Sequence, residues 1–252
     1  NKNFKYKDNI EINFIKNFIS KNFNEINNLN FDYKETQIFR KNKINLNCDR
    51  HFKVFNEFKI IPKYCFTCYK IQIDVENVMN LIKLFFIFNN INLENNNIRK
   101  CIVETRKNVV GNYKGYVFCT GLDEAKKLLI LFSNEIKKTG LNIKEIKIKH
   151  GCTEFYQEFP EFENINYTGK QKFIYQNNWS EKEKLIDSKI YKSEKKDERI
   201  VGPTLNQICL SDILIIKNWI VYAKLINDKS YIEIYKEELN SNFIRDTLVN
   251  QI

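Results

Sequence analysis

Four side chains between residues 48 and 68 have the types and spacing of a metal site. Cys48 and His51 are separated by two residues, and Cys65 and Cys68 repeat that spacing after a gap of 13 residues. One tight turn can present both donors of such a pair to one ion, and two pairs complete the tetrahedral shell that zinc prefers. The sequence therefore predicts a zinc-knuckle loop over residues 48 to 68, with zinc as a structural cofactor.

Two other uses of the cysteines stay open at this point. The thiols could be separate groups that bind no metal, or some of them could hold an iron–sulfur cluster. The candidates for such a cluster are all seven cysteines of the chain: Cys48, Cys65, Cys68, Cys101, Cys119, Cys152 and Cys209. An alternative function is therefore an iron–sulfur or zinc-dependent enzyme that uses the cysteine cluster.

Other candidates for catalysis are few. The chain has two histidines, and one of them, His51, is already a predicted zinc ligand. The other, His150, lies two residues before Cys152, but neighbours two apart at a strand end seldom orient toward each other as a nucleophile and its base must. We therefore assign no catalytic residue, and whether the chain is an enzyme stays open.

The residues that follow Cys68 alternate between strand and helix patterns. A period of two predicts strands over 70–75, 98–106, 113–120 and 143–150, and a period of 3.6 predicts helices over 76–91 and up to residue 138. The connection at 108–112 is too short for a parallel crossover, so it must join an antiparallel pair. The β-α-β-β-α-β order over residues 69 to 154 predicts an α+β protein with a ferredoxin-like centre.

Strand parity divides the side chains of this predicted sheet between two faces. Apolar side chains such as Ile71, Val103 and Val117 face the two helices. The opposite face carries Lys70, Gln72, Asp74, Glu104, Arg106, Tyr116, Phe118, Thr120, Lys147 and Lys149. Two aromatic rings on a central strand, framed by lysine and arginine, form a platform on which bases stack and phosphates find cations.

The sequence of residues 114 to 119, Lys-Gly-Tyr-Val-Phe-Cys, resembles the third-strand motif of RNA recognition motifs, basic-Gly-aromatic-x-aromatic. The resemblance implies that Tyr116 and Phe118 stack on bases and that Lys114 meets a phosphate. It departs from the family pattern at Val117, where a small residue is usual, and at Gly121, where the last aromatic is expected. An alternative stays open, in which other segments cover this face and both aromatics are core residues.

Composition supports an anionic partner. The 252 residues include 41 Lys and Arg against 31 Asp and Glu, so the net charge is +10, which attracts phosphate polymers. We therefore expect RNA or a ribonucleoprotein as the partner, bound through Arg106, Lys114, Tyr116, Phe118, Lys147 and Lys149. Hydrophobic residues make up 43% of the chain, which argues against a wholly disordered protein.

Two further expectations concern location. The longest apolar runs, such as residues 81–88, are far shorter than the roughly 20 residues of a membrane span, so none is expected. An odd number of cysteines with a Cys-x-x-Cys pair favours metal over disulfides, which indicates the cytoplasm or another reducing compartment.

The flanking segments are less regular. Residues 1–47 are predicted to be a helical arm, residues 155–200 a charged linker, and residues 201–252 either a helix or a hairpin, which the pattern does not separate. Charged and aromatic arms can also grip partner proteins, so a structural subunit of a large assembly is a third functional class that stays open.

Overall fold

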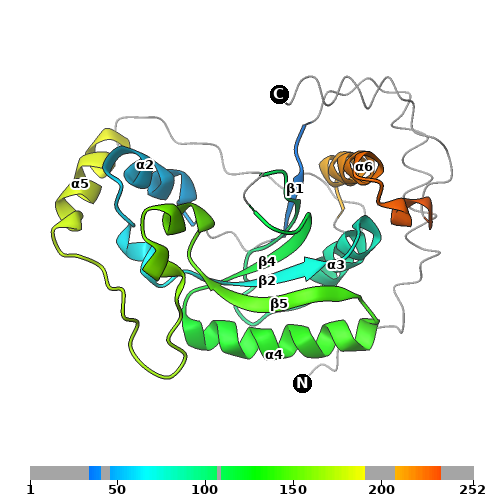
Figure 1. The fold of residues 1–252 in the computed structure, drawn as a ribbon, viewed down its shortest axis with the longest axis horizontal. Coiled ribbons are helices and arrows are strands. Elements are labelled where there is room, and N and C mark those ends of the chain that lie inside the picture. The colour runs from blue at the N-terminus through cyan, green and yellow to red at the C-terminus, as the bar shows by residue number, and fades with distance from the viewer. Residues whose placement is uncertain (1–33, 41–45, 107–108, 191–207, 234–252) are drawn as a thin grey trace.

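The computed structural model describes residues 34–40, 46–106, 109–190 and 208–233. These residues form a mixed α+β fold built on a five-stranded antiparallel sheet (Figure 1). The strands are β1 (Gln37–Arg40), β2 (Tyr69–Val75), β3 (Arg99–Val103), β4 (Tyr113–Cys119) and β5 (Ile143–His150). The α-helices are α2 (Cys48–Phe58), α3 (Val78–Asn90), α4 (Leu122–Thr139), α5 (Trp179–Ile190) and α6 (Leu210–Leu225). The predicted α+β class is confirmed.

The strand order in the sheet is β1-β3-β4-β2-β5, and each neighbouring pair is antiparallel. Along the chain, β2, α3, β3, β4, α4 and β5 follow one another in the predicted strand-helix-strand-strand-helix-strand order. The strand predicted over residues 98–106 is shorter in the structure, where β3 spans Arg99–Val103. The short link after it joins β3 to β4 as an antiparallel pair, as its length required.

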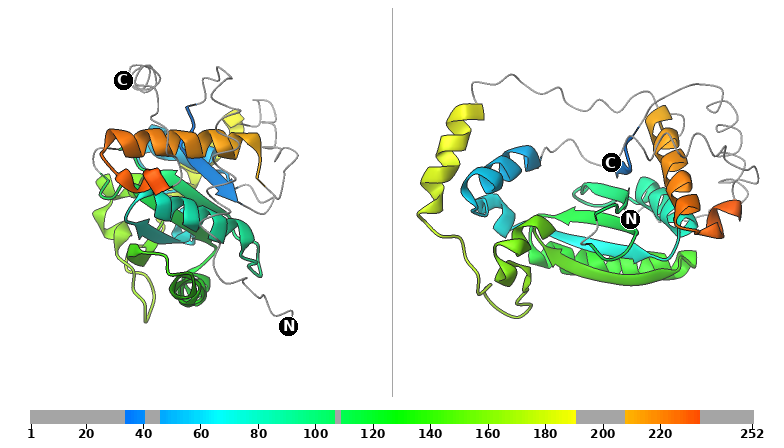
Figure 2. Two further views of the ribbon diagram at one scale, coloured as in Figure 1. Left: turned by 90° about the vertical axis from the view of Figure 1, so that its right-hand side faces the viewer. Right: turned by 45° about the horizontal axis from the view of Figure 1, so that its top comes forward.

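α3 and α4 pack on one face of the sheet, and α6 packs against α3 (Figure 2). α3 is apolar nearly all round because the sheet covers one side and α6 covers another. Gly115 of β4 permits the close approach of α3, since a Cβ at this position would lie 2.5 Å from Leu84 Cδ2 and 3.0 Å from Phe88 Cζ. The glycine of the Lys-Gly-Tyr-Val-Phe-Cys sequence therefore has a packing role.

β1 was not expected. Residues 37–40 belong to the predicted helical arm, but they pair with β3 as the edge strand of the sheet. Arg40 then joins β1 to α6 through a bidentate ion pair with Asp212, with Nη2–Oδ2 and Nη1–Oδ1 distances of 2.8 and 3.2 Å. Strand pairing and this ion pair are long-range contacts, which local periodicity does not reveal. Most of the predicted arm, residues 1–33 and 41–45, lies outside the described residues.

A second core lies at the other end of the sheet, where α2 and α5 are side by side (Figures 1 and 2). It corrects two expectations. Residues 48–58 form α2 instead of a loop. Residues 153–190 contain the 3-10 turns Thr153–Gln157 and Pro160–Glu163 and the helix α5, joined by an irregular segment, and they contribute to this core instead of forming a charged linker. The members of this core are Val54, Phe55, Ile60, Ile61, Cys65, Phe155, Phe162, Trp179 and Ile186. Residues 191–200 of the predicted linker lie outside the described residues.

The C-terminal alternative is resolved in favour of a helix, because residues 210–225 form α6. A hairpin would have left Trp219 and Ile220 on a two-stranded ribbon, whereas both are fully buried against the main core. Residues 201–207 and 234–252 of the predicted region lie outside the described residues. Within the described part of the chain, no helix has the length and apolar character needed to cross a bilayer.

Candidate functional site: a thiol cavity beside the open sheet face

The predicted zinc ligands meet at a small cavity, here called the thiol cavity. Its volume is about 20 Å³, roughly the space of one atom-sized occupant. It is lined by Leu46, Cys48, His51, Phe52, Tyr64, Cys65, Cys68, Phe118, Gly151, Cys152 and Phe155. All four residues singled out by spacing therefore lie at one place, together with a fifth candidate, Cys152.

Each thiol reaches the cavity from a different local structure. Cys48 is the first residue of α2, Cys65 lies in the 3-10 turn Lys63–Phe66, and Cys68 immediately precedes β2. Cys152 follows β5, whose last residue pairs with the first residue of β2 in the sheet. Because β2 and β5 are neighbours, the residues before the one and after the other are brought together, and the Gly151 amide donates to the Cys68 carbonyl at 2.8 Å.

In the described part of the chain, no three His, Cys, Asp or Glu side chains stand as a formed metal site. Burial raises the pKa of Cys65, and it raises the pKa of Cys68 to about 12. Without a cation, both groups are neutral thiols at physiological pH.

His51 lies at the cavity, yet its ring has other partners. It is buried and stacks on Tyr64 with ring centroids 5.3 Å apart. Nδ1 lies 3.4 Å from an Arg50 guanidinium nitrogen, and the ring also hydrogen-bonds to the Leu46 backbone. Burial lowers the pKa of His51, so the ring is held neutral.

Arg50 anchors this end of α2. Its guanidinium donates to the carboxylates of Glu183 and Asp187 on α5, with N–O distances of 2.6 to 2.8 Å. Glu183 is buried and also accepts from the Lys63 amide and the Tyr175 hydroxyl, both at 2.9 Å. A buried carboxylate with this many donors is well satisfied, so it fixes α2, α5 and the 3-10 turn that carries Cys65 relative to one another.

His150 has a structural role. Its two ring nitrogens lie 3.0 Å from the carbonyl oxygens of Phe162 and Phe66. The ring stacks on Tyr69 with centroids 4.5 Å apart and also contacts the Phe162 ring. Both nitrogens are thus occupied by backbone groups, which leaves neither facing Cys152 as a base would have to.

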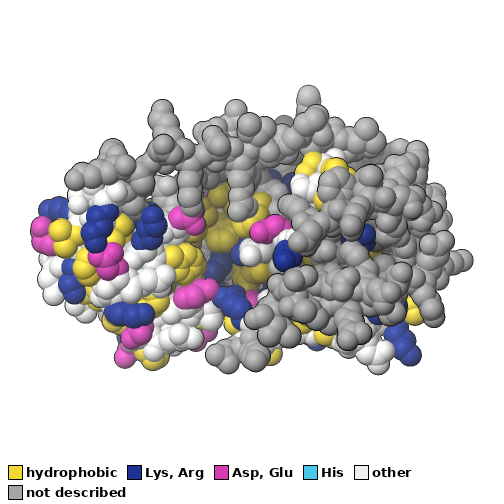
Figure 3. Space-filling view, turned by 90° about the horizontal axis from the view of Figure 1, so that it is seen from above, with side chains coloured by type: hydrophobic (Ala, Val, Ile, Leu, Met, Phe, Trp, Pro, Cys, Tyr) yellow, Lys and Arg dark blue, Asp and Glu magenta, His cyan; other side chains and the backbone are white. Residues whose placement is uncertain are grey.

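The thiol cavity adjoins the sheet face that points away from α3 and α4, here called the open face. Its side chains are Lys70, Gln72, Asp74, Lys100, Lys114, Tyr116, Phe118, Lys147 and Lys149, with Glu104 and Arg106 beyond the end of β3. Viewed from above, hydrophobic and basic side chains lie at the bottom of a hollow beside the lobe that carries α2 and α5 (Figure 3). Phe118 lines both the cavity and the open face.

The predicted platform is more enclosed than strand parity indicated. Tyr116 is only 6% exposed and Phe118 is half-buried. The ammonium groups of Lys70 and Lys100 each lie 5.4 Å from the centre of the Tyr116 ring, and Lys70 also lies 5.8 Å from that of Phe118. The aromatic rings therefore already interact with cations, at a distance typical of cation–π contacts.

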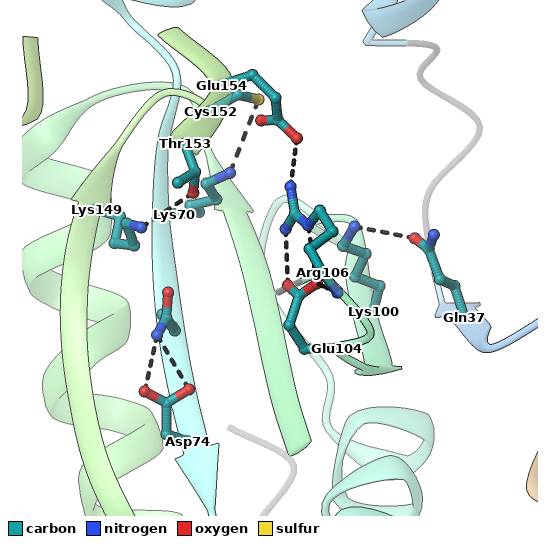
Figure 4. A network of polar contacts seen from close by, with 11 residues as sticks. Gln37, Lys70, Asp74, Lys100, Glu104, Arg106, Lys149, Cys152, Thr153 and Glu154 are labelled. Carbon is teal, nitrogen blue, oxygen red and sulfur yellow. Dashed lines mark hydrogen bonds and ion pairs between the residues drawn. The ribbon is translucent and has the colours of Figure 1, made fainter. Parts of the chain in front are cut away.

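The predicted phosphate-binding residues have different environments. Lys114 is 2% exposed. Lys147 is exposed and pairs with Glu145, while Lys149 donates to Thr153 Oγ1 at 3.2 Å. Arg106 is paired with both Glu104 and Glu154 (Figure 4). Acidic partners therefore balance part of the positive charge that was expected to meet phosphates.

The residues predicted from the sequence to bind RNA did not include Lys100. Strand parity could have assigned it to the open face, because the next residue of β3, Cys101, faces the helices. It pairs with Tyr116 across the strands, and its amine donates to Gln37 Oε1 of β1 at 3.0 Å (Figure 4). Burial, together with the neighbouring Lys70 ammonium, lowers the pKa of Lys100 to about 8. Its amine is thus partly neutral near physiological pH, unlike an ordinary lysine.

Comparison with known proteins adds no further constraint. No protein-family model matches the chain, and neither a curated protein nor a solved structure matches it.

Proposed function

We propose that the chain binds RNA, free or within a ribonucleoprotein, through the open face, and that a structural zinc ion at the thiol cavity holds the edge of this face in place. The observation that carries the proposal is the cluster at the centre of the sheet. Two aromatic rings, Tyr116 and Phe118, lie beneath the ammonium groups of Lys70 and Lys100. Stacking surfaces beside cations are what a single-stranded nucleic acid needs.

The topology supports the same proposal. The four strands β3, β4, β2 and β5 lie side by side in that order, and they arise from a βαββαβ segment with both helices on one face. We infer that this unit is a ferredoxin-like domain, the arrangement that RNA recognition motifs also use. In that arrangement the face without helices is the one that binds the nucleic acid.

The enclosure of Tyr116 defines how binding would occur. The Lys100 side chain is long and flexible, so its ammonium can move from the ring to a phosphate, while the three N–H donors of Lys70 allow it to meet a phosphate without leaving Cys152. Phe118, which is half-buried, would then offer the first stacking surface, and Tyr116 the second. The phosphate would interact with the same ammonium groups that now lie over the rings.

A single zinc ion suits the thiol cavity better than an iron–sulfur cluster. The cavity of about 20 Å³ admits one atom-sized occupant, whereas a cluster also brings inorganic sulfide. With its ligands all from the protein, zinc would supply cross-links between segments and no reactive centre. A structural role therefore accords with our assignment of no catalytic residue.

RNA binding can be tested by fluorescence anisotropy with a labelled single-stranded RNA, using the full chain. Replacing Phe118 and Tyr116 by Ala should weaken binding by roughly 1 to 3 kcal/mol per stacked base. Tyr167→Ala is the matched control, because this tyrosine is 50% exposed and lies outside the open face. Equal affinities for the double variant and the control would refute the platform.

Salt dependence tests the cationic part of the site. If Lys70, Lys100 and Lys149 each neutralise one phosphate, the logarithm of the binding constant should fall against that of the salt concentration with a slope of about −2. Each Lys→Gln substitution should reduce the steepness by about 0.7. Binding that does not change with salt would contradict a phosphate site.

A further inference from the structure

Cys152 is brought to the thiol cavity by a turn that requires glycine. Gly151 has a φ of 58°, and a Cβ on it would clash with the Phe162 ring. The residue is therefore both in the left-handed region and in close contact with an aromatic side chain, where other residues are strained. The turn places the thiol of Cys152 against the segment that carries Cys65 and Cys68.

Four cysteines line the same cavity: Cys48, Cys65, Cys68 and Cys152. Zinc takes four ligands in closed structural sites, and four thiolates are a common set. These four cysteines would therefore suffice as zinc ligands without any contribution from histidine.

Lys70 distinguishes Cys152 from an ordinary half-buried cysteine. The Lys70 ammonium lies 3.8 Å from the Cys152 sulfur, within hydrogen-bonding distance (Figure 4). Lys70 is buried, with 8% of its surface exposed. A buried ammonium requires a strong acceptor, and a thiolate is a far better acceptor than a thiol. Donors to ligand atoms are typical of the second layer around a metal, where they offset negative charge and orient the ligand.

His51 lacks these features. Its ring is engaged by Tyr64, Arg50 and the Leu46 backbone, so a metal ion would have to compete with these partners for the ring nitrogens. The adjacent Arg50 guanidinium would also place a positive charge beside a ligand of a cation. The position of His51 in the Cys-x-x-His spacing is therefore better explained by its packing in α2.

We infer that one zinc ion is held by Cys48, Cys65, Cys68 and Cys152, with Lys70 donating to the Cys152 thiolate and His51 outside the ligand set. The inference rests on the proposed zinc site and specifies its ligands. Binding of Zn²⁺ releases the four thiol protons to solvent, and the tetrathiolate centre carries a net charge of −2 that Lys70 partly offsets. The metal would thereby join the end of β5 to residues 48–68, and Lys70 would join the metal to the rings of Tyr116 and Phe118.

X-ray absorption at the zinc edge of the full, unsubstituted protein counts the ligands by type. We expect four sulfur atoms at about 2.3 Å and no signal from an imidazole ring. Three sulfurs with one nitrogen would overturn the inference but leave the zinc site of the proposed function intact. A protein that contains no zinc would overturn both.

Substitutions give an independent readout. Cys152→Ser should lose zinc to a chelator at least about tenfold faster than the unsubstituted protein, whereas His51→Gln should lose it at the original rate. Cys209→Ser is the matched control, because Cys209 is also half-buried but caps α6, where serine is a favourable residue. The inference would be overturned if His51→Gln lost zinc faster than the unsubstituted protein while Cys152→Ser lost it at the original rate. If Cys152→Ser does not fold, the X-ray absorption of the unsubstituted protein still decides.

Discussion

Lys100 shows how one residue acquires unusual chemistry from its place in the sheet. Its ammonium lies beside Tyr116 and Phe39 and shares the open face with Lys70, so its charged form loses water and faces a like charge. These effects lower its pKa to about 8, from about 10.4 for an ordinary lysine. A phosphate bound over this amine would favour the ammonium and raise the pKa again.

This difference can be measured by amine labelling followed by mass spectrometry. Lys100 should reach half of its maximal labelling rate near pH 8, about two pH units below solvent-exposed lysines. Saturating RNA should shift that midpoint upward, because the bound phosphate stabilises the charged form. A midpoint near 10, unchanged by RNA, would contradict both the burial of this charge and its role in binding.

At the scale of elements, the contact of α3 with β4 depends on Gly115. The helix lies so close to the strand that no side chain fits between Leu84, Phe88 and the β4 backbone. The open face depends on the same contact, because α3 presses against the strand whose other side carries Tyr116. Gly115 occupies the glycine position of the RNA-recognition-like sequence, and helix packing explains why glycine is needed there.

Gly115→Ala should lower the free energy of unfolding by about 1 to 3 kcal/mol, the usual cost of adding a methyl group to a packed core. Chemical denaturation followed by circular dichroism would measure it. Gly121→Ala is the control, because a Cβ there would meet no atom within 4 Å and the backbone is extended. Similar losses in the two variants would show that the α3 contact is not the cause.

At the scale of the whole molecule, the described residues form two hydrophobic cores. The larger core lies between the sheet, α3, α4 and α6, and the smaller one surrounds Phe155 and Phe162 near α2 and α5. The thiol cavity lies where the smaller core meets the end of the sheet. A zinc ion at this point would act as a cross-link between segments that are far apart in the sequence.

Removal of zinc with a chelator should therefore weaken the smaller core first. We expect a lower midpoint of thermal unfolding and faster hydrogen exchange in residues 46–68 and 151–163, since zinc at 1,000 times its Kd would stabilise the folded state by about 4 kcal/mol. Added Zn²⁺ should restore both quantities, while Mg²⁺, which prefers oxygen ligands, should not. Exchange rates that do not respond to the chelator would exclude a structural metal here.

The sequence by itself determined the features that depend on local periodicity. The alternation in residues 69–150 predicted β2, α3, β3, β4, α4 and β5 in order, because each strand or helix repeats its own pattern of burial. Parity then placed Tyr116 and Phe118 on the face away from the helices. Cysteine spacing brought Cys48, His51, Cys65 and Cys68 into one candidate site, and all four line one cavity.

Only the tertiary structure decided what depends on partners distant in the chain. α2 is a helix because Val54 and Phe55 find a core built from residues 155–186, and β1 is a strand because β3 leaves an edge beside it. Cys152 reaches the thiol cavity through the pairing of β5 with β2, more than 80 residues after Cys68. Such contacts produce no repeating pattern in the sequence, because each joins two segments whose separation along the chain is unrelated to their distance in space.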